Sequence, residues 1–249
     1  KIMLPELTFP YLIPGQEVLL DDGKIHLKIV EKAENVTENG GENTQEKRYF
    51  AKVLWGGLLK SRKSAALPGA KIYPPTLTNS DLANIKIAKE MGVTGVMQPF
   101  VRDHSDLECV KEALREAGAE DIRLFAKIEN MDGVRKLEKL LPAADEIVIA
   151  RGDLGNAVHL WDLPGVQRQI SEKCRAAGKP FMVVTQMLAS MERSPVPTRA
   201  EVNDIFHAVM DGAASIMVTG ETAVGDYPVE VIRYMVNTVR SAEKKKIDK

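Results

Sequence analysis

Three side chains with complementary chemistry follow two neighbouring apolar runs of the sequence. Lys127 and Glu129 end one run, two positions apart, and Asp153 follows the next. Residues two apart in a strand point to the same face, so Lys127 and Glu129 are predicted to lie side by side. Two carboxylates without a His or Cys cluster suit a hard cation such as Mg2+ or Mn2+. A structural ion-pair network of Lys127, Glu129 and Arg151 fits equally well, and residue types alone leave both interpretations open.

Glycines and hydroxyls accompany these charges. Gly152 and Gly155 flank Asp153 closely, and glycine lets backbone N–H groups approach an anion, although a tight turn needs the same residue. Thr185 and Thr219 end two further apolar runs and could bind a substrate or relay a proton. Threonine at such a place is also a common helix cap, so neither hydroxyl is a specific signal by itself.

The elements that carry these residues read as repeated strand–helix units. Short apolar runs alternate with segments of helical periodicity that often end in glycine, which is typical of parallel βα units. The runs are 95–97, 124–126, 147–150, 181–184 and 216–218. Polar residues follow several different runs, as they do at the carboxyl ends of the strands in a barrel. The pattern therefore favours an α/β fold, a (β/α)8 TIM-type barrel with about five of its eight units visible, over a doubly wound sheet.

Residues 1–67 have a different pattern. Alternating strand-like segments near 18–20, 26–30 and 48–54 surround turn signals at Asp21-Asp22-Gly23 and within the polar stretch 34–47. We predict a small all-β domain over 1–67, incomplete at its start, and the second part of the barrel over 68–249. The chain opens on Lys1 rather than Met, which is typical of a segment inside a longer polypeptide.

Composition narrows the function classes. Net charge is −1, which gives no basic field for nucleic acid, and no apolar run approaches the roughly 18 residues that span a bilayer. Cys109 and Cys174 lack metal-ligand spacing and form no disulfide framework, which indicates a reducing, cytoplasmic compartment. Asp204 and His207 could form an acid–base pair, but three-residue spacing on a helix favours a surface pair. No phosphate loop or dinucleotide fingerprint is present.

Taken as whole strings, the clusters resemble the signature segments of pyruvate kinases, in the family's order. The matching strings are 125–130 (FAKIEN), 150–155 (ARGDLG), 185–188 (TQML), 197–202 (PTRAEV), 211–213 (DGA), 220–223 (GETA) and 225–228 (GDYP). The resemblance as a whole spans about Asp21 to Pro228, which is most of the chain. In the β segment, 60–63 (KSRK) resembles the part of the family's mobile lid whose last lysine, here Lys63, reaches the nucleotide phosphates.

The resemblance implies roles for the matching positions. Lys127 would neutralise charge on the phosphoryl group and the enolate oxygen, and Glu129 and Asp153 would ligate Mg2+ or Mn2+. The backbone of Arg151 and Gly152 would hold the carboxylate of phosphoenolpyruvate together with Thr185.

Thr219 stands where the family usually has serine, and because a hydroxyl is kept, the resemblance implies that Thr219 would support a water-relayed protonation of the enolate. The catalytic set is thus Lys127, Thr185 and Thr219. The implied reaction transfers the phosphoryl group of phosphoenolpyruvate to ADP, giving pyruvate and ATP in glycolysis.

The resemblance also implies what is outside this sequence. The family's first three barrel strands, with the K+ ligands and most nucleotide ligands, would precede Lys1, and its C-terminal domain would follow about Arg240. Pyruvate kinases are generally homotetramers, so a homo-oligomer is expected. Two alternatives are a non-catalytic pyruvate-kinase-like fragment or paralogue and a metal-dependent pyruvate-enolate lyase or aldolase. An aldol reaction needs no nucleotide lid, so Lys63 favours the kinase.

Overall fold

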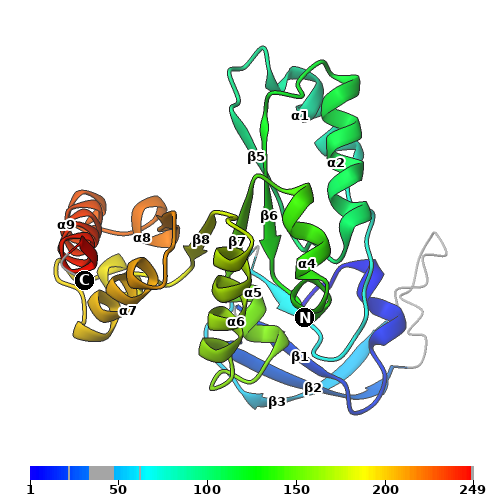
Figure 1. Ribbon diagram of the computed structural model, residues 1–249. Helices are drawn as coiled ribbons and strands as arrows, with labels where there is room; N and C mark the ends of the chain where they lie inside the picture. Colours follow the sequence, from blue (N-terminus) through cyan, green and yellow to red (C-terminus); the bar gives the residue numbers. More distant parts are fainter. Residues whose placement is uncertain (22, 34–47, 62, 248–249) are drawn as a thin grey trace. The chain divides into compact units, whose positions relative to one another are not determined.

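The structure is a computed structural model that describes residues 1–21, 23–33, 48–61 and 63–247 (Figure 1). It divides into two compact units, Lys1–Pro75 and Thr76–Lys249. The sequence boundary was expected at Leu67, and the structure places the division after Pro75. The predicted turn chemistry within 34–47 and at Asp22 lies outside the described residues.

The first unit is built on an antiparallel sheet with strand order β3-β2-β1-β4. Its elements are the 3-10 helix η1 (Glu6–Tyr11) and strands β1 (Glu17–Leu20), β2 (Ile25–Lys32), β3 (Tyr49–Trp55) and β4 (Ala65–Ala66). Alternate residues of β1 and β2 form its core, among them Val18, Leu20, Leu27 and Ile29. Because strand side chains alternate between faces, this spacing gives the sheet one buried side. The strands predicted in this part of the sequence are therefore confirmed.

The second unit contains a parallel sheet whose strands pair in chain order. The strands are β5 (Gly95–Gln98), β6 (Arg123–Ile128), β7 (Glu146–Ala150), β8 (Phe181–Val184) and β9 (Ser215–Met217). Each corresponds to one of the predicted apolar runs, so the α/β fold with parallel βα units is confirmed. Among the described residues β5 and β9 each pair with a single strand, and the sheet is not closed into a barrel.

Helices connect these strands (Figure 1). The α-helices are α1 (Asn79–Ala88), α2 (His104–Glu116), α3 (Met131–Arg135), α4 (Leu137–Leu140), α5 (Arg151–Ala157), α6 (Leu163–Ala176), α7 (Arg199–Met210), α8 (Gly220–Ala223) and α9 (Pro228–Ile247). Two 3-10 helices, η2 (Leu141–Ala143) and η3 (Ala189–Glu192), complete the unit. No described helix is both long and apolar enough to span a membrane.

The middle strand of the parallel sheet, β7, is buried on both faces. Ile147 and Ile149 of β7 belong to the large core under the helices, whereas Val148 and Ala150, on the other face, pack with Val184 of β8. Every residue of β7 is buried, which explains why its sequence is a continuous apolar run rather than an alternating one.

Glycines end three of the connecting helices, as the sequence predicts. Gly118, Gly178 and Gly212 have φ values of +62°, +62° and +94°, in the left-handed region that glycine adopts without steric cost. The N–H of the residue after each glycine returns to a carbonyl of the last helical turn, as in Ala119 to Leu114 at 2.9 Å. The strands β6, β8 and β9 begin within five residues after Gly118, Gly178 and Gly212, respectively.

Candidate active site at the carboxyl ends of the strands

The predicted site residues of the second unit follow the ends of four adjacent strands. Lys127 lies near the end of β6, Arg151 to Asp153 open α5 after β7, and Thr185 and Thr219 follow β8 and β9. The carboxyl ends of parallel strands meet at one edge of a sheet, so these residues share that edge.

Lys127 and Glu129 form an ion pair, as their spacing predicts. The Nζ atom of Lys127 lies 2.7 Å from Oε1 of Glu129, and the exposed fractions of the two side chains are 25% and 1%. The other carboxylate oxygen, Oε2, accepts a hydrogen bond from the backbone N–H of Phe100 at 2.6 Å. A buried carboxylate with a donor on each oxygen is fixed in orientation.

The loop after β5 supplies that second donor. Phe100 has φ +52°, an uncommon conformation for a bulky residue. Hydrogen bonds from Val101 N–H to the Lys127 carbonyl and from Asn130 Nδ2 to the Val101 carbonyl tie the loop to the end of β6. The role of the Phe100 N–H as a donor to Glu129 was not predicted from the sequence, because a backbone donor leaves no residue-type signal.

A buried carboxylate anchors the same loop. Asp106 accepts hydrogen bonds from the backbone and side chain of Arg102, and Thr76 donates to it at 2.6 Å. Burial opposes ionisation of Asp106, but these donors outweigh it and lower its pKa to about 2. The loop that presents the Phe100 N–H is therefore held at its far end by a charged pair.

Arg151 and Gly152 contact the loop that follows β8. The Arg151 guanidinium donates to the Thr185 carbonyl from Nη2 at 2.6 Å and from Nε at 3.2 Å. A Cβ atom on Gly152 would lie 3.0 Å from Cγ2 of Thr185, so the close approach of the two loops favours glycine there. Thr185 and Gln186 have φ values of +79° and +55°. The structure thus brings Arg151, Gly152 and Thr185 together.

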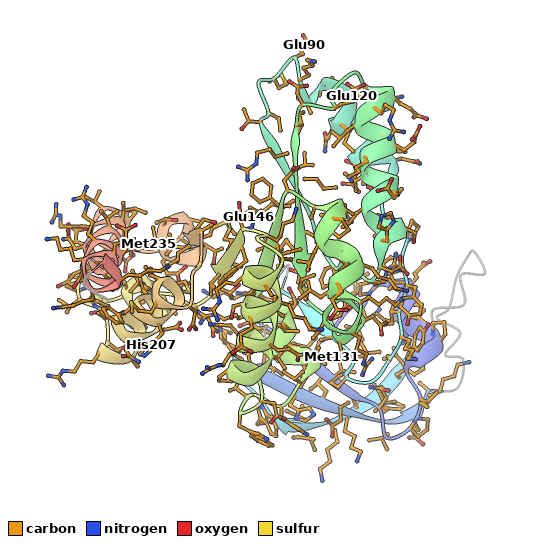
Figure 2. All side chains as sticks on the ribbon, in the orientation of Figure 1. Glu90, Glu120, Met131, Glu146, His207 and Met235 are labelled. Atoms are coloured by element: carbon orange, nitrogen blue, oxygen red, sulfur yellow. The ribbon has the colours of Figure 1, made fainter. Side chains whose placement is uncertain are left out.

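The pairing expected for Asp204 is wrong. Its Oδ2 lies 2.6 Å from Nη1 of Arg151, 53 positions away in the sequence, and not beside His207. His207 lies on α7 (Figure 2), and its Nδ1 is 2.8 Å from the Asn203 carbonyl. Arg151 therefore pairs with Asp204 and does not join Lys127 and Glu129 in the network considered above.

A further buried carboxylate, Glu221 of α8, follows β9 and was not predicted as a site residue from the sequence. Glu221 accepts hydrogen bonds from the backbone N–H groups of Thr219 at 2.8 Å and Leu188 at 3.1 Å. The Thr219 hydroxyl faces the same carboxylate at 3.4 Å. Glu221 therefore joins the loop after β8 to the loop after β9. In the sequence it belongs to the polar cluster after the last apolar run and to the string GETA, but neither pattern predicts this role.

The donor set suits a hard cation. Asp153 is half-buried in the first turn of α5, and Glu129 follows the adjacent strand. A carboxylate has about four lone-pair sites, so the two hydrogen bonds that Glu129 accepts leave it capacity for a metal. Among the residues described, no three His, Cys, Asp or Glu side chains gather closely enough to hold an ion alone. Mg2+ commonly binds to one or two carboxylates, with water or substrate phosphates completing its shell.

Lys63 lies in the first unit, where it forms an ion pair with Asp21 at 2.9 Å. The hydrogen bond from Lys63 is the main reason that the pKa of Asp21 falls below its usual value. Asp21 has φ +50° and its N–H donates to the Ser64 carbonyl, so the turn after β1 and the segment before β4 are joined here. Arg62 of the same string lies outside the described residues.

Comparison with known proteins agrees with the sequence motifs. The family model "Pyruvate kinase, barrel domain" matches residues 6–232. Pyruvate kinases of Geobacillus stearothermophilus and Bacillus licheniformis are 40% and 38% identical to the chain over 233 and 229 residues. The pyruvate kinase of Chlamydia trachomatis serovar D is 34% identical over 242 residues.

These matches cover nearly all of the chain but less than half of each relative. They include 92% of the chain for the first two relatives and 97% for the third, but only 38%, 37% and 47% of the relatives' own lengths. On the length of the family match and the identity to these relatives, the chain belongs to the pyruvate kinase family.

Proposed function

We propose that this chain supplies the lid and the second portion of the catalytic (β/α)8 barrel of an active pyruvate kinase, which transfers the phosphoryl group of phosphoenolpyruvate to ADP. The Lys127–Glu129 pair carries the proposal. A lysine ammonium on an orienting carboxylate, at the carboxyl edge of a parallel sheet, is suited to charge stabilisation in phosphoryl transfer. The α/β fold and the family membership support the same activity.

Positioned charges would do most of the catalysis. The Lys127 ammonium, a quarter exposed, would stabilise negative charge on the phosphoryl group and then on the enolate oxygen of pyruvate. Backbone groups of Arg151 and Gly152, with Thr185, would bind the substrate carboxylate. Thr219, whose side chain is exposed, would support protonation of the enolate through water.

Glu129 and Asp153 would hold Mg2+ or Mn2+. When bound, the cation supplies positive charge between the substrate and the phosphoryl group. The Phe100 N–H holds Oε2 of Glu129, and this hydrogen bond does not depend on Lys127, so it would still orient Glu129 if Lys127 turned toward the substrate. K+ is expected from the family, with its ligands outside these residues.

Lys63 would bind the nucleotide phosphates. Its ion pair with Asp21 gives it a fixed position within the first unit and must be exchanged for phosphate when nucleotide arrives. We further propose a homotetramer, as is general in the family. The two cysteines are both free, which supports a reducing, cytoplasmic location.

The test is pyruvate formation by the full-length natural protein that contains this sequence, because the chain covers less than half of its curated relatives. Phosphoenolpyruvate, ADP, Mg2+ and K+ are supplied, and pyruvate is measured by coupling to lactate dehydrogenase. We expect ADP-dependent pyruvate formation in wild type and none in Lys127→Met. Pyruvate released without ADP from a 4-hydroxy-2-oxo acid, supplied in place of phosphoenolpyruvate, would favour the lyase alternative, and no pyruvate from folded wild type in either assay would favour a non-catalytic member.

A further inference from the structure

The Arg151 side chain, at the first position of α5, contacts the end of β8 and the loop that follows it. Nε and Nη2 donate to the Thr185 carbonyl, Nε also lies 3.3 Å from the Val184 carbonyl, and Nη2 contacts the Met187 sulfur. Only 13% of the side chain is exposed. The guanidinium therefore spans the loop after β8 from its first residue to its third.

That loop holds a conformation that its residues do not favour. Thr185 is β-branched, and φ +79° is a genuine outlier for such a residue, so the conformation is strained. Because the peptide bond is planar and trans, the Thr185 carbonyl and the Gln186 N–H point in opposite directions. Whatever holds the carbonyl toward Arg151 therefore also orients the Gln186 N–H away from it.

Asp204 determines where the guanidinium lies. It sits on α7, a helix whose start is fixed by a capping box between Thr198 and Glu201. Its Oδ2 accepts a hydrogen bond from Nη1 of Arg151 at 2.6 Å. The other two guanidinium nitrogens, Nε and Nη2, remain available as donors to the loop after β8. The carboxylate also neutralises a largely buried cation, so that the guanidinium has no unpaired charge to draw it toward an anion.

We propose that Asp204 is a positioning residue for the substrate-carboxylate site. It locks the Arg151 side chain onto the Thr185 carbonyl, and so fixes the strained Thr185–Gln186 peptide in the orientation that substrate binding needs. Asp204 itself touches no substrate. The identity of the substrate rests on the proposed function, whereas the lock on the loop does not.

The test compares Asp204→Asn with wild type in the full-length protein, by two measurements. Asparagine is nearly isosteric and removes only the charge and one acceptor. The first measurement is the Met187 methyl NMR signal in substrate-free protein, because Met187 touches Arg151. Its signal should shift or broaden, while that of Met131 on α3 stays unchanged. The second is steady-state kinetics: the KM for phosphoenolpyruvate should rise roughly tenfold, with a smaller change in kcat, as expected for one lost charge-assisted hydrogen bond.

Two further variants sharpen the result. Glu172→Gln removes an exposed ion pair with Arg168 on α6, at 2.9 Å, and should change neither the Met187 signal nor the KM. Asp204→Glu retains the charge and should lie between wild type and Asp204→Asn in both measurements. It also replaces Asp204→Asn if that variant does not fold.

The outcomes separate the two proposals. An unchanged Met187 signal in folded Asp204→Asn overturns the positioning role whatever the activity, and so does an equal shift of the Met131 signal, which would mean a general loss of structure. A shifted Met187 signal with unchanged KM also overturns it. A wild-type protein that forms no pyruvate refutes the proposed function, while the Met187 signal still decides whether Asp204 holds the loop.

Discussion

Replacing Lys127 with methionine would leave the Glu129 carboxylate buried with one donor. The substitution removes the ammonium 2.7 Å from Oε1 and leaves the Phe100 N–H on Oε2. Removing one partner of a fully buried ion pair costs about 3–5 kcal/mol. Lys127 is 25% exposed and water can replace part of its contact, so we expect a smaller loss, about 2–3 kcal/mol of unfolding free energy.

This loss is large enough to measure by thermal unfolding. For a unit of the size of Thr76–Lys249, each kcal/mol corresponds to about 2–4 °C, so the midpoint should fall by about 4–12 °C. Lys139→Met is the matched control, since Lys139 is exposed on α4, and its midpoint should stay close to that of wild type.

Adding Mg2+ distinguishes a metal ligand from a purely structural ion pair. A ligand that binds only the folded state stabilises it by about 2.7 kcal/mol at a hundred times its Kd. Without the ammonium, Glu129 is free to bind the cation, so Mg2+ should stabilise Lys127→Met at least as much as wild type. The variant should nevertheless form no pyruvate.

Three results would each refute part of this reasoning. An unchanged midpoint would mean that the Lys127–Glu129 pair contributes little to stability. No stabilisation of either protein by Mg2+ would remove Glu129 from the metal site. Retained pyruvate formation would remove Lys127 from the centre of the chemistry.

Three other outcomes are expected. Glu129→Gln and Asp153→Asn should each weaken Mn2+ binding in calorimetry, because a carboxylate ligand becomes a neutral amide, and unchanged affinity would place the cation elsewhere. Asp106, with its pKa lowered to about 2, contributes stability that is present above its unfolded pKa near 4 and is lost as the pH falls toward 2. In Asp106→Asn the unfolding midpoint should therefore change less with pH between about 4 and 2 than it does in wild type. A pH dependence as steep as that of wild type would contradict this. Cys174 is buried, and burial raises its thiol pKa to about 12, so at pH 8 a thiol reagent should label Cys109 in the native protein and Cys174 only after denaturation.

The fold of the second unit could be predicted because its signals are local. Each parallel strand is a short apolar run, and glycines such as Gly118 and Gly178 mark the helix ends with the backbone conformation that they adopt. The Lys127–Glu129 pair followed from strand periodicity for the same reason. A barrel closes only if β5 and β9 also pair with further strands. Sequence periodicity predicts single strands and not their partners, so it could not distinguish a closed barrel from an open sheet.

The contacts that orient the site could not be predicted. Asp204 and Arg151 are 53 positions apart, and the spacing of Asp204 from His207 suggested a nearer partner. The donor from Phe100 belongs to the backbone, and the left-handed conformation of Thr185 runs against the preference of its own side chain. Such features arise only when the strand ends have been brought together, so no local pattern encodes them.

The chain order of the parallel strands has a consequence for how the second unit folds. Every strand from β6 to β9 pairs with the strand before it in the sequence, so each new βα unit docks on structure already formed. Pairing between consecutive strands keeps the partners as close in sequence as a parallel sheet with helical connections allows, which lowers the entropy cost of closing each loop. A ribosome releases the chain in this same order, and the sheet can therefore grow during synthesis, one strand at a time.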